Sequence, residues 1–175
     1  MNQVARKAVE QAWERLCAMN EQQTETLVKQ FMEEQPALGI YLFASGETLE
    51  AGSLQESPLI DLVIASWQVL SLAAGRRLNP VTPQQIESAE EFNTKALEQL
   101  ENASEIEQQK TVQQTFENYP QRELLGFGVE ILMSGHEENP ELAPESIGME
   151  LLWLRTVIDC LDRQGKALTS DPAGH

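Results

Sequence analysis

The strings LGIYLFASG, residues 38–46, and FGVEILMSG, residues 127–135, decide how the rest of the chain is interpreted. The first contains a continuous apolar run and the second an apolar run with one glutamate, Glu130. Periodicity cannot separate a buried strand from a buried helix over so short a stretch. The ambiguity covers Leu38–Ser45 and Leu124–Ser134. Nearly all of the flanking sequence has helical spacing, which favours helices for both strings. The sequence therefore predicts an all-α fold of roughly eight helices.

Helical spacing recurs along the remaining segments. The apolar residues Val4, Ala8, Ala12 and Leu16 form one stripe of a first helix. The run Leu59–Ala74 is apolar nearly all round, which is typical of a helix at the centre of a fold. We therefore expect this segment to lie in the middle of the molecule.

Two later helices have recognisable starts. Thr82 followed by Pro83 fits an N-cap and a first helical position, and the string SEIE, residues 104–107, fits a capping box. The buried side of the first of these helices is predicted to include Phe92, Leu97 and Leu100. Val112, Phe116 and Tyr119 follow in the second, before Pro120. A last helix is expected over about Ser146–Arg163.

The two strings also indicate an internal repeat. A shift of 89 positions gives seven identities over the 37 positions that begin at Leu38. The predicted architecture is one domain, residues 1–165, made of two duplicated four-helix halves, 1–79 and 80–165, about a pseudo-twofold axis. The glycines of the two strings, Gly39 and Gly128, would allow a close crossing of two short helices near that axis. Residues 166–175 are interpreted as a C-terminal tail.

Composition excludes several classes of partner. The chain has 28 acidic and 12 basic residues, for a net charge of −16. Phosphate backbones are neutralised by Lys and Arg, so nucleic acid and anionic membranes are disfavoured. The excess of Glu over Asp is typical of a solvated helical surface. Cys17 and Cys160 form no CxxC pair, and the N-terminus has no apolar signal core, so a cytoplasmic protein is expected.

Residue patterns for catalysis, cofactors and metals are absent from the sequence. Neither of the two histidines follows a Glu at the spacing of helical di-metal sites. His136 is expected to be an exposed loop residue. The string DRQGKAL lacks the glycine and hydroxyl positions of a phosphate-binding loop. No catalytic, cofactor or metal residue is therefore assigned.

These observations favour a non-enzymatic, acidic module for protein–protein interaction. An inhibitor or adaptor of a basic partner belongs to this class, and the oligomeric state is left open. The candidate interaction residues lie in two loops that the repeat relates, and they are Glu47, Glu50, His136, Glu137 and Glu138. Loops carry functional residues more often than the elements that they join.

Two alternatives remain. The first is a small apolar-ligand binding protein with a pocket between the two halves, lined by Trp67 and Trp153. The second is a metal-dependent enzyme that uses carboxylates.

Overall fold

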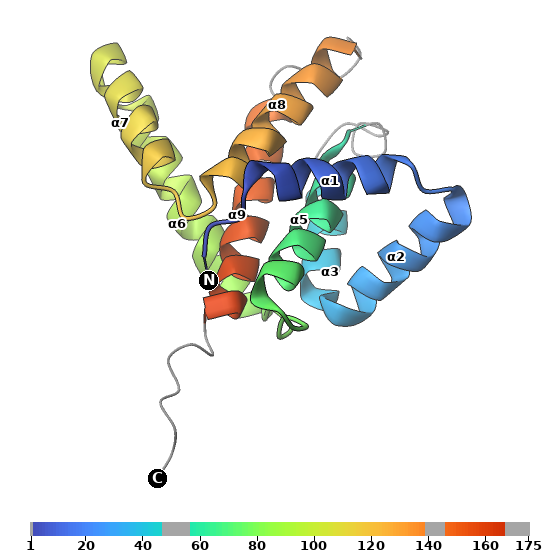
Figure 1. Ribbon diagram of the computed structural model, residues 1–175. Helices are drawn as coiled ribbons and strands as arrows, with labels where there is room; N and C mark the ends of the chain where they lie inside the picture. Colours follow the sequence, from blue (N-terminus) through green and yellow to red (C-terminus); the bar gives the residue numbers. More distant parts are fainter. Residues whose placement is uncertain (1, 47–56, 139–145, 167–175) are drawn as a thin grey trace.

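The computed structural model describes residues 2–46, 57–138 and 146–166, and these residues form eight α-helices and no strand (Figure 1). The helices are α1 (Arg6–Cys17), α2 (Glu21–Glu34), α3 (Pro36–Gly46), α5 (Leu59–Ala74), α6 (Pro83–Glu101), α7 (Glu105–Glu117), α8 (Arg122–Glu138) and α9 (Ser146–Lys166). The two ambiguous strings lie in α3 and α8. The prediction of an all-α fold is therefore confirmed.

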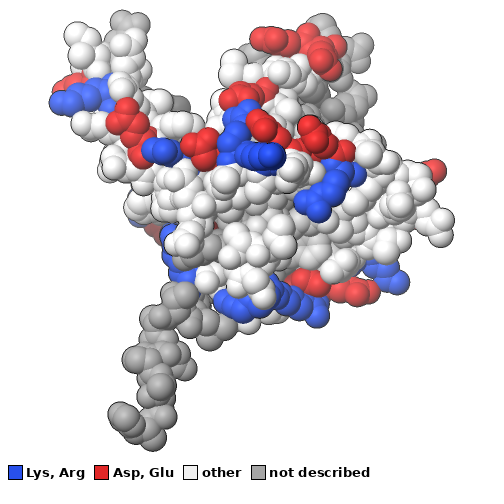
Figure 2. Space-filling model, viewed as in Figure 1, with Lys and Arg blue, Asp and Glu red and all other residues white. Residues whose placement is uncertain are grey.

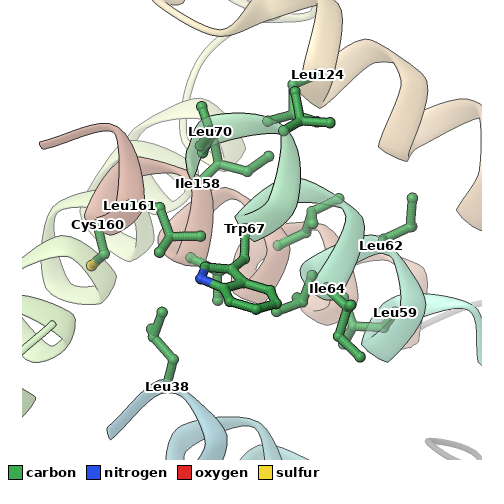
Figure 3. Close-up of a cluster of buried hydrophobic side chains, with 14 of the residues drawn as sticks. Leu38, Leu59, Leu62, Ile64, Trp67, Leu70, Leu124, Ile158, Cys160 and Leu161 are labelled. Atoms are coloured by element: carbon green, nitrogen blue, oxygen red, sulfur yellow. The ribbon is translucent and has the colours of Figure 1, made fainter. Parts of the chain in front are cut away.

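Helices α5 and α9 form the centre of the molecule. They pack against each other, α1 packs on α5, and α6 and α8 pack on α9. Figure 3 shows Trp67 and Leu70 of α5 in one buried cluster with Ile158 and Leu161 of α9, and Leu38 of α3 reaches the same cluster. Burying a Leu or Ile side chain contributes about 1.5–3 kcal/mol. The apolar sequence of α5 is thus explained by its central position.

The helix boundaries follow their capping residues. Thr82 and Gln85 form a reciprocal capping box, in which each backbone N–H is bonded by the other side chain. Glu107 accepts a hydrogen bond from the backbone N–H of Ser104 at 3.1 Å, as the capping box predicts. Helix α5 ends at Gly75, whose φ of 66° lies in the left-handed region that glycine tolerates.

Two glutamines make matching contacts at the entrances of α6 and α1. Gln35, next to α3, accepts a hydrogen bond from the backbone N–H of Val81 at 2.9 Å. Its amide nitrogen donates to the backbone carbonyl oxygen of Asn79. Gln121, next to α8, accepts a hydrogen bond from the backbone N–H of Val4 at 2.9 Å. Its amide nitrogen likewise donates to the backbone carbonyl oxygen of Asn2. Each proposed half thus fixes the chain that enters the first helix of the other. The duplication itself stays a prediction.

The predicted crossing of two glycine-containing helices is wrong. A methyl group on Gly39 would lie 2.2 Å from the sulfur of Met32 in α2. A methyl group on Gly128 would lie 2.4 Å from a methyl carbon of Leu154 in α9. Each glycine therefore makes room for a side chain of its own half, and neither marks a contact between α3 and α8.

Candidate functional site

A groove lies between the hairpin of α6 and α7 and the pair α8 and α9. Its volume is about 570 Å³. In Figure 1 these helices form two arms, with α7 and α8 furthest apart at the end where α6 passes into α7. We call that open end the mouth and the opposite end, where α7 passes into α8, the closed end. The walls are apolar, with Leu97, Leu100, Val112 and Phe116 on the α6–α7 side and Leu125, Val129, Leu151 and Leu152 on the other.

The groove lies beside the part of α6 by which this helix is longer than α1, the other helix whose entrance a buried glutamine holds. The glutamine contacts place Val81 before α6 as Val4 stands before α1, so Cys17, at the end of α1, corresponds to Thr94. Helix α6 continues for seven more residues, to Glu101. The groove residues Ala96, Leu97, Leu100 and Ala103 all come after the point at which α1 ends.

The two hairpins consequently differ in how their second helix is packed. Helix α2 packs on α3 and α5, and it buries Leu27 and Phe31, whose ring meets Trp67 edge-on at 5.6 Å. Helix α7 makes its main contacts with α6 alone. Val112 and Phe116 therefore keep 51% and 41% of their surface exposed. The first half fills its own groove with α2, whereas the second half leaves its groove open.

The sequence interpretation of this region needs correction. Phe92 and Leu97 were expected on a buried face, but they are 61% and 44% exposed. Val112 and Phe116 on α7 are likewise exposed. Leu97, Val112 and Phe116 line the groove, where the wall that would cover them is missing because the extended α6 holds α7 away from α8 and α9. Phe92 lies outside the groove lining, and nothing in the structure explains its exposure.

Polar side chains gather at the closed end of the groove. The carboxylate of Asp159 accepts hydrogen bonds from the Tyr119 hydroxyl at 2.8 Å and from the Asn93 amide at 3.1 Å. Arg155 stacks over the Tyr119 ring, with its guanidinium carbon 5.6 Å from the ring centroid. Burial, with the nearby charge of Asp159, raises the pKa of Tyr119 well above its ordinary value. The groove therefore has an apolar body and a hydrogen-bonding end.

The negative charge of the chain is concentrated in the half that carries the groove. Residues 80–165 contain seventeen acidic and five basic side chains, against ten and six in residues 1–79. Figure 2 shows acidic side chains gathered at the free end of α8 and acidic and basic side chains side by side where the two arms meet. The described residues that line the groove include no acidic side chain. The groove thus lies in a negative field without being acidic itself.

His136 is not an exposed loop residue, and that prediction is wrong. It lies in the last turn of α8, and its Nε2 is 3.0 Å from Oε2 of Glu150, with the two side chains 5% and 0% exposed. Helix α8 continues past Gly135, since that residue fits against Pro58 and needs no left-handed conformation. Ser146 lies beside the pair, with its Oγ 3.5 Å from the same histidine nitrogen.

That arrangement is not a catalytic triad. The serine and the carboxylate both face Nε2, and Nδ1 has no hydrogen-bond partner among the described residues. A triad needs the carboxylate on one ring nitrogen and the nucleophile on the other. The pair therefore ties α8 to α9 without the geometry for nucleophilic catalysis.

The other predicted site residues are dispersed. Glu137 and Glu138 are exposed in the last turn of α8, in a helix and not in a loop. Glu47 and Glu50 lie outside the described residues. Trp67 and Trp153 are 3% and 2% exposed in the core, and neither lines the groove. The described groove also lies wholly within residues 93–155, inside the second half and not between the two.

Comparison with protein families, curated protein sequences and solved structures finds no match to this chain. Within the described ranges, no helix is long and apolar enough to cross a membrane. Nor do those ranges hold a group of three or more His, Cys, Asp or Glu side chains placed to bind a metal ion. The geometry of the groove is therefore the main guide to function.

Proposed function

We propose that the protein is a non-enzymatic interaction module that binds an amphipathic helix of a basic partner protein in the groove between α6, α7, α8 and α9. The observation that carries the proposal is the unfilled apolar groove of about 570 Å³. Burial of apolar surface drives most protein association, and an amphipathic helix in an apolar groove is a recurring mode of recognition. An inhibitor or an adaptor would use the groove in the same way. The proposed compartment is the cytoplasm, which free Cys17 and Cys160 support.

The dimensions of the groove fit about three turns of helix. Its lining extends from Asn93 in α6 to Ala103, two residues past the end of that helix, a length of about 15 Å at about 1.5 Å per residue. The chain itself shows how a helix is seated beside such walls. Leu27 and Phe31 of α2, one turn apart, fill the corresponding space in the first half. The partner helix is expected to present apolar side chains at the same spacing.

Apolar side chains around the mouth favour a protein over a small ligand. Ile106, Met133 and Met149 are 82%, 49% and 41% exposed, and none of them lines the groove. A ligand enclosed in the groove would leave them in water, whereas a longer helix would cover them. Exposed apolar surface of this kind often marks an interaction site, and methionine adapts to varied partners.

Charge favours a basic partner over a second copy of this chain. The half that holds the groove has seventeen acidic against five basic side chains, so two copies would repel each other as they approached. A basic helix would instead be attracted, and its association would be faster at low salt. The proposal therefore commits to a partner with lysine or arginine on the polar face of its helix.

The proposal is tested with a synthetic helical peptide of about twelve residues, with leucines at helical spacing and lysines elsewhere. Its binding is measured by fluorescence anisotropy. The decisive variant is Gly148→Leu, because a side chain at Gly148 meets no atom within 4 Å and would stand in the groove. The matched control is Gln114→Leu, on an exposed position of α7 outside the groove lining.

We expect Gly148→Leu to weaken peptide binding at least about tenfold and the control to leave it unchanged. Raising the ionic strength from about 0.1 M to about 1 M shortens the screening length from about 10 Å to about 3 Å, and should weaken binding further. Equal binding by wild type and Gly148→Leu would refute the proposal. So would binding of dodecanoate in place of the peptide, or a wild-type dimer that Gly148→Leu converts to a monomer.

A further inference from the structure

We infer that the groove binds its helix in one direction only, with the carboxyl-terminal end at Arg155 and the amino-terminal end at the mouth. This inference rests on the proposed function and adds the polarity of the bound partner. It is carried by the hydrogen-bonding state of Arg155 and by the distribution of charge along the groove.

Arg155 is the only charged residue among the described residues that line the groove. Its Nε lies 3.9 Å from a carboxylate oxygen of Asp159, which is too long for a hydrogen bond. That Nε is buried and has no hydrogen-bond partner. Asp159 is already bonded by Tyr119 and Asn93. The Nε is therefore enclosed by the protein, and the guanidinium stacks on Tyr119. Neither Nη group forms a hydrogen bond within the described residues, so the two Nη groups are the donors that an acceptor in the groove can reach.

The opposite end of the groove is acidic. Glu137 and Glu138 end α8, and Glu107 lies in the first turn of α7, all three with exposed side chains. Figure 2 shows this acidic cap on the free end of α8. A ligand in the groove therefore meets the guanidinium donors of Arg155 at the closed end, where Asp159 offsets part of the positive charge. At the mouth it meets three acidic side chains and one basic side chain, Lys110, one turn after Glu107.

A helix has the complementary polarity. Its last four carbonyl groups lack intrahelical partners, and its dipole places about half a negative charge at the carboxyl end and about half a positive charge at the amino end. Carbonyl and carboxylate oxygens accept from a guanidinium fork. The reverse direction would place unpaired N–H groups against Arg155. Only one direction pairs both ends of the helix with opposite charge.

The first experiment is a double-mutant cycle. The leucine–lysine peptide is made with a free carboxylate or with an amide at its carboxyl end, and each form is titrated into wild type and Arg155→Met. We expect the carboxylate form to bind wild type about tenfold more tightly than the amide, the size of one charge-assisted hydrogen bond. Arg155→Met should abolish that preference, and Arg155→Lys should keep part of it. Urea unfolding of both variants checks that the fold is intact.

The second experiment reads the direction itself by disulfide trapping. Ala103→Cys places a thiol in the groove lining at the end of α6 near the mouth, in a background in which Cys17→Ser removes the exposed native thiol. A peptide with cysteine at its amino end should form the disulfide, and one with cysteine at its carboxyl end should not. The opposite trapping result would overturn the proposed direction alone. So would equal binding of the carboxylate and amide forms, if Gly148→Leu still prevents the peptide from binding. Absence of any peptide binding would instead overturn the proposed function.

Discussion

The matching contacts of Gln35 and Gln121 allow a quantitative comparison within one molecule. Both side chains are 0–1% exposed, and each accepts a hydrogen bond from a backbone N–H at 2.9 Å. Replacing either by alanine leaves that donor buried and unpaired, at about 1–3 kcal/mol. Gln121 has one further bond, since it donates to the carboxylate of Asp162 at 2.7 Å. A hydrogen bond to a charged group contributes about 1.5–3 kcal/mol.

We therefore expect Gln121→Ala to lower the free energy of unfolding by about 1.5–3 kcal/mol more than Gln35→Ala. The volume removed is the same in both variants, so the cavity term cancels to first order. Urea denaturation followed by circular dichroism gives both values, provided that the denaturant slope stays constant. Hydrogen exchange of the Val4 and Val81 amides should accelerate only in the variant that loses the respective acceptor.

A third variant separates the carboxylate from the rest of the contact. Asp162 also forms an ion pair with Lys166, so Asp162→Asn is measured both alone and together with Gln121→Ala. The two losses should be less than additive if the Gln121–Asp162 bond stabilises the fold. Equal losses in the two glutamine variants, or a larger loss for Gln35→Ala, would show that the Gln121–Asp162 bond does not stabilise the fold. It would also show that the reasoning from exposure and bond partners is wrong here.

Three smaller predictions concern thiols, tyrosines and a close helix contact. Ellman's reagent should modify exposed Cys17 in the native protein and reach Cys160 only after unfolding, because burial encloses that thiol and raises its pKa to about 12. Burial also raises the pKa of Tyr41 and Tyr119, so neither phenol should ionise near pH 11 while the protein is folded. The free energy of unfolding should therefore fall as the pH rises above about 10, because the phenols of the unfolded chain lose their protons there. Absorbance at 295 nm measures both effects. Gly128→Ala should destabilise by about 1–3 kcal/mol, because its methyl group would lie 2.4 Å from a leucine methyl of α9, and thermal unfolding against wild type checks this.

Local signals predicted most of the helices correctly. The capping box at Ser104, the cap at Thr82 and the all-round apolar run before Gly75 each act within a few residues, so the sequence contains the whole interaction. Two glycines show the limit of such reasoning. Gly75 has a φ of 66° and ends its helix, whereas Gly135 has no positive φ and lies inside α8. The residue type is the same at both positions, and Gly135 lies against Pro58, a contact that the local sequence does not contain.

The groove could not be predicted from periodicity, because an apolar stripe does not reveal whether another helix covers it. One signal was present nonetheless. Helix α7 has only Ile106, Val112 and Phe116 as large apolar residues, and Ile106 is off the stripe of the other two. So few apolar residues give a weak drive to pack the helix onto α8 and α9. The buried pair of His136 and Glu150 was missed for a related reason, since its partners are fourteen residues apart and meet only in the folded chain.

The hairpins α1–α2 and α6–α7 differ in how their second helix packs, and this difference supports the proposed role of the groove. In the first half a short α1 lets α2 return onto α3 and α5, and Phe31 reaches Trp67 in the core. In residues 80–165 α6 is seven residues longer than α1, a difference of about 10 Å that carries α7 outward. The α1–α2 hairpin is thus packed closed, whereas the α6–α7 hairpin stays open. The apolar inner face of the open hairpin stays exposed, whereas the corresponding face of the other hairpin is covered by the chain itself. A helix from a basic partner would supply that packing.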